Sequence, residues 1–399
     1  MLSSTCAGEV AGAITETMRS EGYAESTVRL ASRCLARLVE SCGASGGVYT
    51  PQVGAAFASD TTDPRTGRPS EQRRKLRGRL VRLADSYVET GRVDLSVRRR
   101  PGPQPASEAG RRVLAGWEAW TRAEGWAAES VAQHMSYARR FLLHLEQGPG
   151  GDVGQAPPGA AEDFLVSLRA TCAPSSMRTV KNVLAAFARF AGRDDLADGF
   201  AQARTERKRS PLPVLSDAEV EAIAAACGRA PVRDAAITLL ALTTGLRAVD
   251  ICAMELGQVD WRAGRISLVQ SKTGNPLTIP LPAAAGNAIT RYLLEERPAV
   301  PDRRVFVRSL APYTALSGHS SIRRAIKEVL DDAGVSPAQA GTRLTRHSLA
   351  SRMLAARVAH PTIAAVLGHA DPGSVDVYLE TDRESMRECV LPLPEAARP

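Results

Sequence analysis

The chain has 399 residues, which is enough for two or three domains with a buried core in each. Hydrophobic residues make up 44% of it and charged residues 24%, values that exclude a disordered chain. The formal net charge is +8, and the excess is local, because residues 61–112 hold 14 basic and 6 acidic residues. Such a strip is typical of proteins that bind polyanions, but a solvated arginine-rich face has the same composition.

The seven cysteines are scattered, and no two of them form a C-x-x-C pair. This usage indicates a reducing compartment and argues against structural zinc. The first ten residues lack the basic and apolar regions of a signal peptide, and the longest apolar stretch, near Ala235–Leu246, is too short and too rich in threonine to span a bilayer. We therefore expect a cytoplasmic protein with no membrane partner.

Proline-rich and basic stretches divide the chain. Closely spaced prolines resist helix formation, so residues 98–105 and 204–213 are expected to be linkers. The expected parts are a helical N-terminal domain (1–100), a second helical domain (101–203), a basic linker (204–213), a third domain (214–391) and a tail (392–399).

The first two domains are expected to be helical. Apolar residues recur at helical spacing in both of them. In the first domain the clearest segments are Ser26–Val39 and Gln72–Val88. The second domain reads as a compact unit of four helices, Ser107–Glu124, Ala128–Glu146, Glu162–Arg169 and Ser175–Phe190.

The third domain combines helices with a small sheet. Ser216 and Glu219 form a capping box for a helix that runs to Cys227, and an apolar helix follows over Val232–Leu242. Ile266–Gln270 and Leu277–Leu281 alternate like strands around a turn that carries Lys272, which predicts a hairpin with a lysine at its tip. The remaining expected helices are Ala284–Glu296, Ser320–Ala333, Thr345–Ala356, Pro361–Val366, a short one around Tyr378, and Arg383–Leu391. The fold class is mainly α, in several domains, with a small antiparallel sheet.

Four short motifs carry candidate functional residues. Thr244-Gly245-Leu246-Arg247 places an arginine after a glycine break, with Asp250 close enough to pair with it. Further along come Arg343-Leu344-Thr345-Arg346-His347, then Leu367-Gly368-His369, then Tyr378. Each motif alone is also typical of ordinary structure, such as a capped arginine or a turn histidine.

Taken in this order, the motifs resemble the tyrosine recombinase (phage integrase) family. The match covers about Leu212–Leu391 and includes TGLR, the SKTG hairpin, RLTRH, LGH and the spaced tyrosine. The resemblance implies a C-shaped clamp on duplex DNA. A helical, SAM-like core-binding domain over 101–203 would contact one face, and a mostly helical catalytic domain with a small sheet would contact the other.

The resemblance also implies a role for each candidate residue. Tyr378 would be the nucleophile, and Arg247 and Arg346 would clamp the phosphate, which gathers negative charge that the fork of an arginine can bind. Lys272 would protonate the leaving 5′ oxygen, and His369 would donate a hydrogen bond to the phosphate. The phenol of Tyr378 has a pKa of about 10, so it needs a cationic pocket to ionise.

Arg343 departs from the family pattern. The first residue of the family's H-x-x-R motif is usually histidine, whereas here Arg343 stands one helical turn before Arg346. His347 is not taken as a shifted replacement, because many members carry a histidine there as well. Arginine cannot accept a proton near pH 7, so tyrosine activation is expected to differ, and Arg343 is kept as a candidate catalytic residue.

The expected function is site-specific DNA recombination for a mobile element, through a 3′-phosphotyrosyl intermediate and a Holliday junction. No metal, nucleotide or other cofactor is expected. The expected partners are double-stranded DNA with inverted-repeat core sites, three further copies in a synaptic tetramer, and accessory or partner recombinases. The alternatives are a type IB topoisomerase and a catalytically silent DNA-binding protein.

Two regions have open roles. Residues 1–100 are either an arm-site DNA binder or a protein-interaction module, and the basic segment Arg73–Arg82 favours DNA. The segment after Tyr378, residues 383–399, which includes the tail, either docks on a neighbouring protomer or packs on its own domain.

Overall fold

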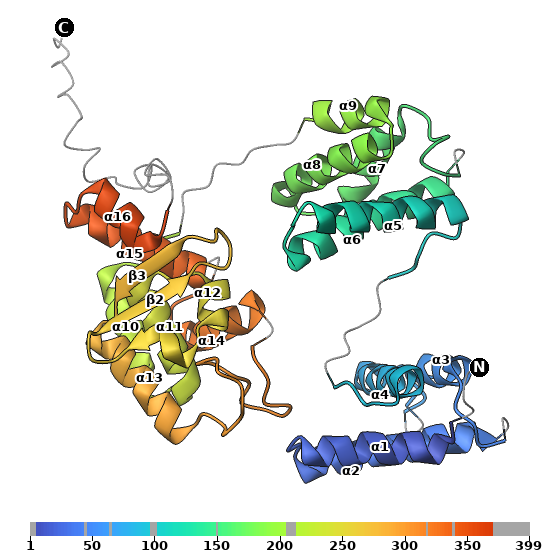
Figure 1. The fold of residues 1–399 in the computed structure, drawn as a ribbon, viewed down its shortest axis with the longest axis horizontal. Helices are drawn as coiled ribbons and strands as arrows, with labels where there is room; N and C mark the ends of the chain where they lie inside the picture. Colours follow the sequence, from blue (N-terminus) through green and yellow to red (C-terminus); the bar gives the residue numbers. More distant parts are fainter. Residues whose placement is uncertain are drawn as a thin grey trace, which may run out of the picture. The chain divides into compact units, whose positions relative to one another are not determined.

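The computed structural model describes residues 5–43, 46–63, 66–95, 102–148, 151–204, 213–316, 318–336 and 340–369. These residues form two compact units, one drawn from Arg98–Ser210 and the other from Met1–Val97 and Pro211–Pro399. The mainly helical fold with a small antiparallel sheet is confirmed (Figure 1). Most of the basic linker, Tyr378, the two helices expected near and after it, and the tail lie outside the described residues.

The first 95 residues contribute a layer of helices with its own core. The expectation of an all-helical segment is confirmed for the described residues, with two helices beyond those marked by periodicity. Ile14, Leu35, Leu80 and Leu83 are buried at the centre of this core. The helices are α1 (Ala7–Ser20), α2 (Glu25–Ser41), α3 (Pro51–Ser59) and α4 (Glu71–Thr90).

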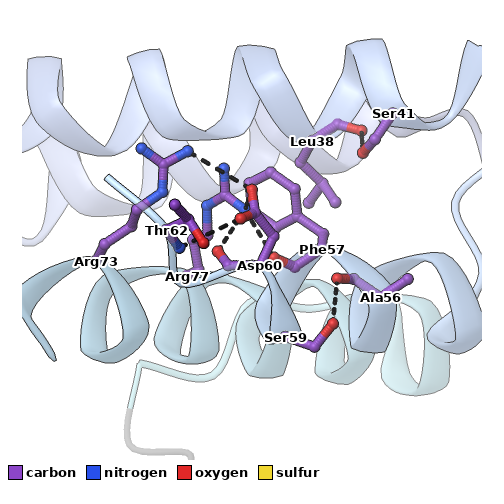
Figure 2. A network of polar contacts seen from close by, with 9 residues as sticks. All are labelled: Leu38, Ser41, Ala56, Phe57, Ser59, Asp60, Thr62, Arg73 and Arg77. Carbon is purple, nitrogen blue, oxygen red and sulfur yellow. Dashed lines mark hydrogen bonds and ion pairs between the residues drawn. The ribbon is translucent and has the colours of Figure 1, made fainter. Parts of the chain in front are cut away.

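One basic side chain of α4 is buried (Figure 2). Arg77 Nη1 donates to the carbonyl oxygens of Phe57 and Asp60 at 2.9 and 2.8 Å, and to Asp60 Oδ2 at 2.7 Å. Its guanidinium also lies over the Phe57 ring, 4.0 Å from the centroid. The hydrogen bond from Arg77 lowers the pKa of the Asp60 carboxyl, which Arg73 approaches to 3.7 Å. The Arg77 side chain of α4 therefore binds the end of α3 through hydrogen bonds and an ion pair.

The unit within Arg98–Ser210 is a bundle around an aromatic core. Phe141, Phe187 and Phe200 are fully buried, and the rings of Phe141 and Phe200 meet edge to face at 5.2 Å. The described helices are α5 (Glu108–Ala123), α6 (Ala128–Glu146), α7 (Ala160–Leu168), α8 (Pro174–Phe190) and α9 (Asp194–Gln202). The expectation of four helices was one short, because α9 also buries apolar residues, Leu196 and Phe200 among them.

The segment 213–369 is built around α11 (Val232–Thr244). This helix packs against α13, α14 and α15, and nine of its 13 residues are buried. Before it, the capping box of Ser216 and Glu219 starts α10 (Asp217–Ala226), as predicted. The chain then turns at Gly245 into α12 (Ala248–Ala253). The other helices here are α13 (Ala283–Glu295), α14 (His319–Asp332), α15 (Thr342–Ala355) and α16 (His360–Leu367), with a 3₁₀ turn, η2 (Leu256–Gln258).

The sheet has three antiparallel strands, β1 (Val259–Asp260), β2 (Arg265–Val269) and β3 (Pro276–Pro280), in the order β1-β2-β3. In β2 and β3 every second residue is buried, and Ile266 pairs with Ile279 on the core face. The predicted hairpin is confirmed. Strand β1 was not predicted, because two residues are too few to show alternation. The packing of α16 on β3 brings the last described helix close to the hairpin.

Candidate active site

Arg346 lies at the centre of the site, on α15. Only 7% of this residue is exposed, and both terminal nitrogens bind main-chain oxygens. Nη1 donates to Gly245 O at 2.9 Å, and Nη2 donates to Leu367 O at 2.6 Å. One guanidinium therefore joins the end of α11 to the end of α16, which lie more than 120 residues apart in the sequence.

The glycine break before Arg247 has a steric cause. Gly245 has a φ of 63°, in the left-handed region, and ends α11. A Cβ at this position would lie 3.0 Å from Leu367 Cδ2 and 3.1 Å from Leu349 Cδ2. Glycine thus lets the end of α11 approach α15 and α16 closely enough for its carbonyl group to meet Arg346.

Arg247 is the N-cap residue of α12 and has a buried acidic neighbour. Its Nη1 lies 4.0 Å from Asp250 Oδ2, so the predicted pairing is confirmed. The Asp250 side chain is fully buried, and its Oδ1 also accepts a hydrogen bond from Ser271 N at 2.7 Å. Asp250 therefore links the arginine to the start of the hairpin turn that carries Lys272.

Lys272 is at the tip of the β2–β3 hairpin. The turn is closed by a hydrogen bond from Gln270 N to Asn275 O at 2.9 Å, and Gly274 takes a left-handed φ of 71°. The Lys272 side chain is exposed and has no ion-pair or hydrogen-bond partner within the described residues. Its ammonium group is therefore available to a ligand.

His369 follows the left-handed residue Gly368, whose φ is 64°, at the end of α16. Its backbone N–H donates to Ala364 O at 2.9 Å, which fixes the chain at this point, and its side chain is half-buried. The neighbouring Leu367 carbonyl binds Arg346. The histidine thus belongs to the same group of joined loops.

Arg343 and His347 differ from Arg346 although they lie on the same helix. Arg343 is exposed, whereas His347 is buried. Burial and the charges of Arg343 and Arg346 lower the pKa of His347 to about 4. His347 is therefore neutral near pH 7 and poorly suited to accept a proton there, in agreement with the expectation that it does not replace the missing histidine.

Of the six candidate residues, four come from loops and a helix that hydrogen bonds join together: Arg247, Lys272, Arg346 and His369. Arg343 lies one turn from Arg346 on exposed surface, and Tyr378 lies outside the described residues. Among the described residues, no three histidine, cysteine, aspartate or glutamate side chains gather as metal ligands would. None of the described helices has the length and apolar character needed to cross a membrane.

Gln270, the last residue of the expected first strand of the hairpin, belongs to none of the predicted site residues. It is 1% exposed and follows Ile266 and Leu268 on the buried face. A polar residue that continues an apolar alternation was the available signal. Two of its partners, Arg247 and Gly368, lie 23 and 98 residues away in the sequence, so spacing could not identify them.

Comparison with known proteins identifies the family. The sequence model of the phage integrase family matches residues 213–385. A relative from Sinorhizobium fredii, y4gC, carries an integrase/recombinase name and is 38% identical over 167 residues, which cover 41% of this chain and 85% of y4gC. The chain belongs to the phage integrase family.

Relatives in the phage integrase family differ in length. Another from Sinorhizobium fredii, y4rA, is 37% identical over 166 residues, but the match spans only 40% of y4rA and 42% of this chain. Among solved structures, a lambda integrase tetramer bound to a Holliday junction has a TM-score of 0.53 and 17% identity, with 79% of this chain and 90% of the integrase chain covered. This likeness establishes the phage integrase fold, and the family resemblance stated from the motifs is confirmed.

Proposed function

We propose that this phage integrase family member is a site-specific tyrosine recombinase, which cuts and rejoins duplex DNA through a 3′-phosphotyrosyl intermediate. The observation that carries the proposal is the pair of hydrogen bonds from Arg346 to Gly245 O and Leu367 O. Through these bonds one buried arginine joins the loop that leads to Arg247 and the loop that leads to His369. Residues from three separate motifs are joined in this way, and we propose that they bind the scissile phosphate.

The proposed clamp consists of Arg247 and Arg346. In-line attack at phosphorus increases the negative charge on the non-bridging oxygens, and guanidinium groups held in place before the reaction stabilise that charge. The charge of an arginine does not vary near neutral pH, which suits this role. His369 donates a further hydrogen bond to the same phosphate.

The proposed nucleophile is Tyr378. Its oxygen attacks the phosphorus, the bond from phosphorus to the 5′ oxygen breaks, and Lys272 donates a proton to that oxygen as it leaves. The phenol proton passes to water, to a phosphate oxygen or through His369. The phosphotyrosyl link keeps the bond energy for rejoining, so neither ATP nor a metal ion is required in this scheme.

The proposed partners are duplex DNA with inverted-repeat core sites and three further copies of the chain. A solved lambda integrase structure is a tetramer on a Holliday junction, and we propose the same assembly for this chain. Residues 101–203 would act as the core-binding domain and residues 204–213 as a basic linker. Accessory proteins or partner recombinases would set the direction of the reaction.

The test uses a nicked duplex built from inverted repeats in the DNA that flanks the gene. Wild-type protein is expected to form an SDS-resistant adduct on it, and Tyr378→Phe should bind the same duplex without forming the adduct, because only the nucleophilic oxygen is lost. Tyr292→Phe is a matched control, since Tyr292 is 1% exposed and its hydroxyl accepts a hydrogen bond from Val307 N.

An adduct that persists in Tyr378→Phe would overturn the assignment of the nucleophile. Specific binding by the wild type without any adduct would indicate the catalytically silent DNA-binding protein instead. Relaxation of a supercoiled plasmid that lacks the repeats, without strand exchange, would indicate a type IB topoisomerase.

A further inference from the structure

Gln270 is a buried polar residue between the Lys272 hairpin and the end of α16. Its side chain is 1% exposed, at the point where β2 enters the hairpin turn. A buried amide is costly unless its oxygen and its NH₂ group both find partners. The partners of Gln270 therefore indicate what holds it there.

The hydrogen-bond network fixes which way the amide faces. With Oε1 toward Arg247, this oxygen accepts a hydrogen bond from Nη1 at 2.6 Å, and Nε2 donates to Gly368 O at 2.8 Å and to Thr273 Oγ1 at 2.9 Å. The opposite direction would set the NH₂ group against the guanidinium and the amide oxygen against Gly368 O. One side chain thus contacts a clamp arginine, the residue after Lys272 and the residue before His369.

The close approach depends on glycine at position 368. Gly368 has a left-handed φ of 64°, and a Cβ on this residue would overlap the Gln270 amide. The glycine of the LGH motif therefore both ends α16 and makes room for the glutamine.

Gln270 is also the nearer of the two acceptors that Arg247 has in this region. The amide oxygen lies 2.6 Å from Nη1, whereas the Asp250 carboxylate lies 4.0 Å from the same nitrogen. A distance of 4.0 Å provides attraction but little control over the plane of the guanidinium. The direction in which Arg247 presents its fork is therefore set mainly by Gln270.

We propose that Gln270 is a positioning residue, which holds the Arg247 guanidinium in the orientation that binds the scissile phosphate. It does not touch DNA and acts through Arg247, so the inference rests on the proposed function. A clamp that rotates away from the phosphate loses transition-state stabilisation, and small misplacements of this kind cost up to about 10²-fold in rate.

The test measures single-turnover cleavage of the nicked inverted-repeat duplex by the full-length protein. Gln270→Met keeps the length of the side chain without hydrogen bonding, and should slow cleavage about 10- to 100-fold while DNA affinity changes less than about 2-fold. Gln270→Glu keeps an oxygen toward Arg247 but replaces the donor to Gly368 O with an acceptor, so it should restore part of the rate and cleave faster than Gln270→Met. Gln258→Met is the matched control, because the Gln258 side chain accepts from the Glu255 backbone N–H at 3.0 Å and binds no other described residue.

A second substrate distinguishes an effect of Gln270 through Arg247 from an effect through the hairpin that carries Lys272. A bridging 5′-phosphorothiolate leaves without a proton, so it should rescue Lys272→Ala but not Gln270→Met. Rescue of Gln270→Met by this substrate would show that the glutamine acts through the lysine hairpin, and would overturn the proposal. A Gln270→Met rate equal to wild type, or a Gln270→Glu rate as low as that of Gln270→Met, would overturn it as well.

Two further measurements distinguish a folding defect from a loss of function. Thermal unfolding of each full-length variant shows whether it folds, and if Gln270→Met does not, the rate of Gln270→Glu decides the proposal. If wild-type protein forms no Tyr378-dependent adduct, the proposed function fails, and the role of Gln270 fails with it. If wild-type protein forms the adduct and the Gln270 variants cleave at the wild-type rate, only the inference about Gln270 fails.

Discussion

Arg343 and Arg346 stand one turn apart on α15 in different surroundings. Arg346 is buried and bound to two main-chain oxygens. Arg343 is exposed, and no hydrogen bond or ion pair joins it to another described residue. Its positive charge still acts at a distance, since it is one cause of the lowered pKa of His347. In the proposed mechanism Arg346 clamps the phosphate, and we propose for Arg343 only an electrostatic effect on the Tyr378 phenol.

These different roles predict that substitutions of Arg343 and Arg346 slow cleavage to different extents. Arg346→Ala should be close to inactive, with a loss of about 10² or more in the cleavage rate, because charge on the transition state is left uncompensated. Arg343→Ala should be impaired but measurable, and Arg343→His should retain substantial activity. The measurement is the single-turnover cleavage rate of the three variants between pH 6 and 9.

We also predict how the cleavage rate depends on pH. The pKa of His347 is lowered to about 4, so this imidazole is already deprotonated at pH 6 and adds no step above it. Cleavage should rise with pH as the phenol loses its proton more readily. If Arg343→Ala is as inactive as Arg346→Ala and Arg343→His is no better, Arg343 itself binds the phosphate and the proposed difference in roles is wrong.

Among the helices, α4 depends on one buried charge. Arg77→Met removes the donors for the Phe57 and Asp60 carbonyl groups, and leaves these acceptors without their partner (Figure 2). We expect a local destabilisation of about 2 kcal/mol, which corresponds to about 30-fold faster amide exchange. Hydrogen exchange of peptides from α3 and α4 measures this in the full-length protein.

Arg74→Met provides the comparison on the same helix. The side chain of Arg74 is 53% exposed and lies 3.5 Å from Glu71, an exposed pair that contributes little to stability. Exchange in α3 and α4 should remain close to wild type in this variant. Equal acceleration by Arg74→Met and Arg77→Met would show that the buried network does not hold α4 in place.

The helices and their ends were predicted well where the sequence signal lay within a few residues. The capping box of Ser216 and the turn at Gly245 mark helix ends through contacts within a few residues. Helix α9 was missed because its apolar residues, such as Leu196 and Phe200, span scarcely two turns. The contacts of Gln270 with Arg247 and Gly368 were missed for a different reason. They join segments 23 and 98 residues apart, which only folding brings together.

At the scale of the whole molecule, the distribution of charge bears on residues 1–100. The basic character of α4 favoured DNA binding, but Arg77 is buried, Arg73 approaches Asp60, and Arg79 donates to the Tyr23 hydroxyl at 2.5 Å. Arg74 and Lys75 are the exposed cations of this helix, and both lie near Glu71. The charge that α4 offers to a phosphate backbone is therefore smaller than its composition indicates.

This limits how strongly α4 can make DNA binding depend on salt. Each phosphate neutralised steepens the dependence of log K on log salt by about 0.9, so loss of both exposed cations should flatten it by at most about 2. The variant is Arg74→Gln with Lys75→Gln in the full-length chain, and the measurement is DNA affinity across a salt series. Glu71→Gln is expected to tighten binding, because it removes a competing carboxylate. An unchanged slope in the double variant would favour a protein-interaction module for residues 1–100.

The exposed position of Lys272 has a consequence for conformational entropy. Its four side-chain torsions are unrestrained within the described residues, and fixing them costs up to about 2 kcal/mol. Arg346, by contrast, is ordered before any DNA is present. In the proposed mechanism the general acid therefore becomes ordered only when a correctly seated duplex offers it contacts that compensate for this cost. A wrong duplex would meet the arginines without ordering the lysine, so binding and cleavage would differ in how strictly they select a sequence.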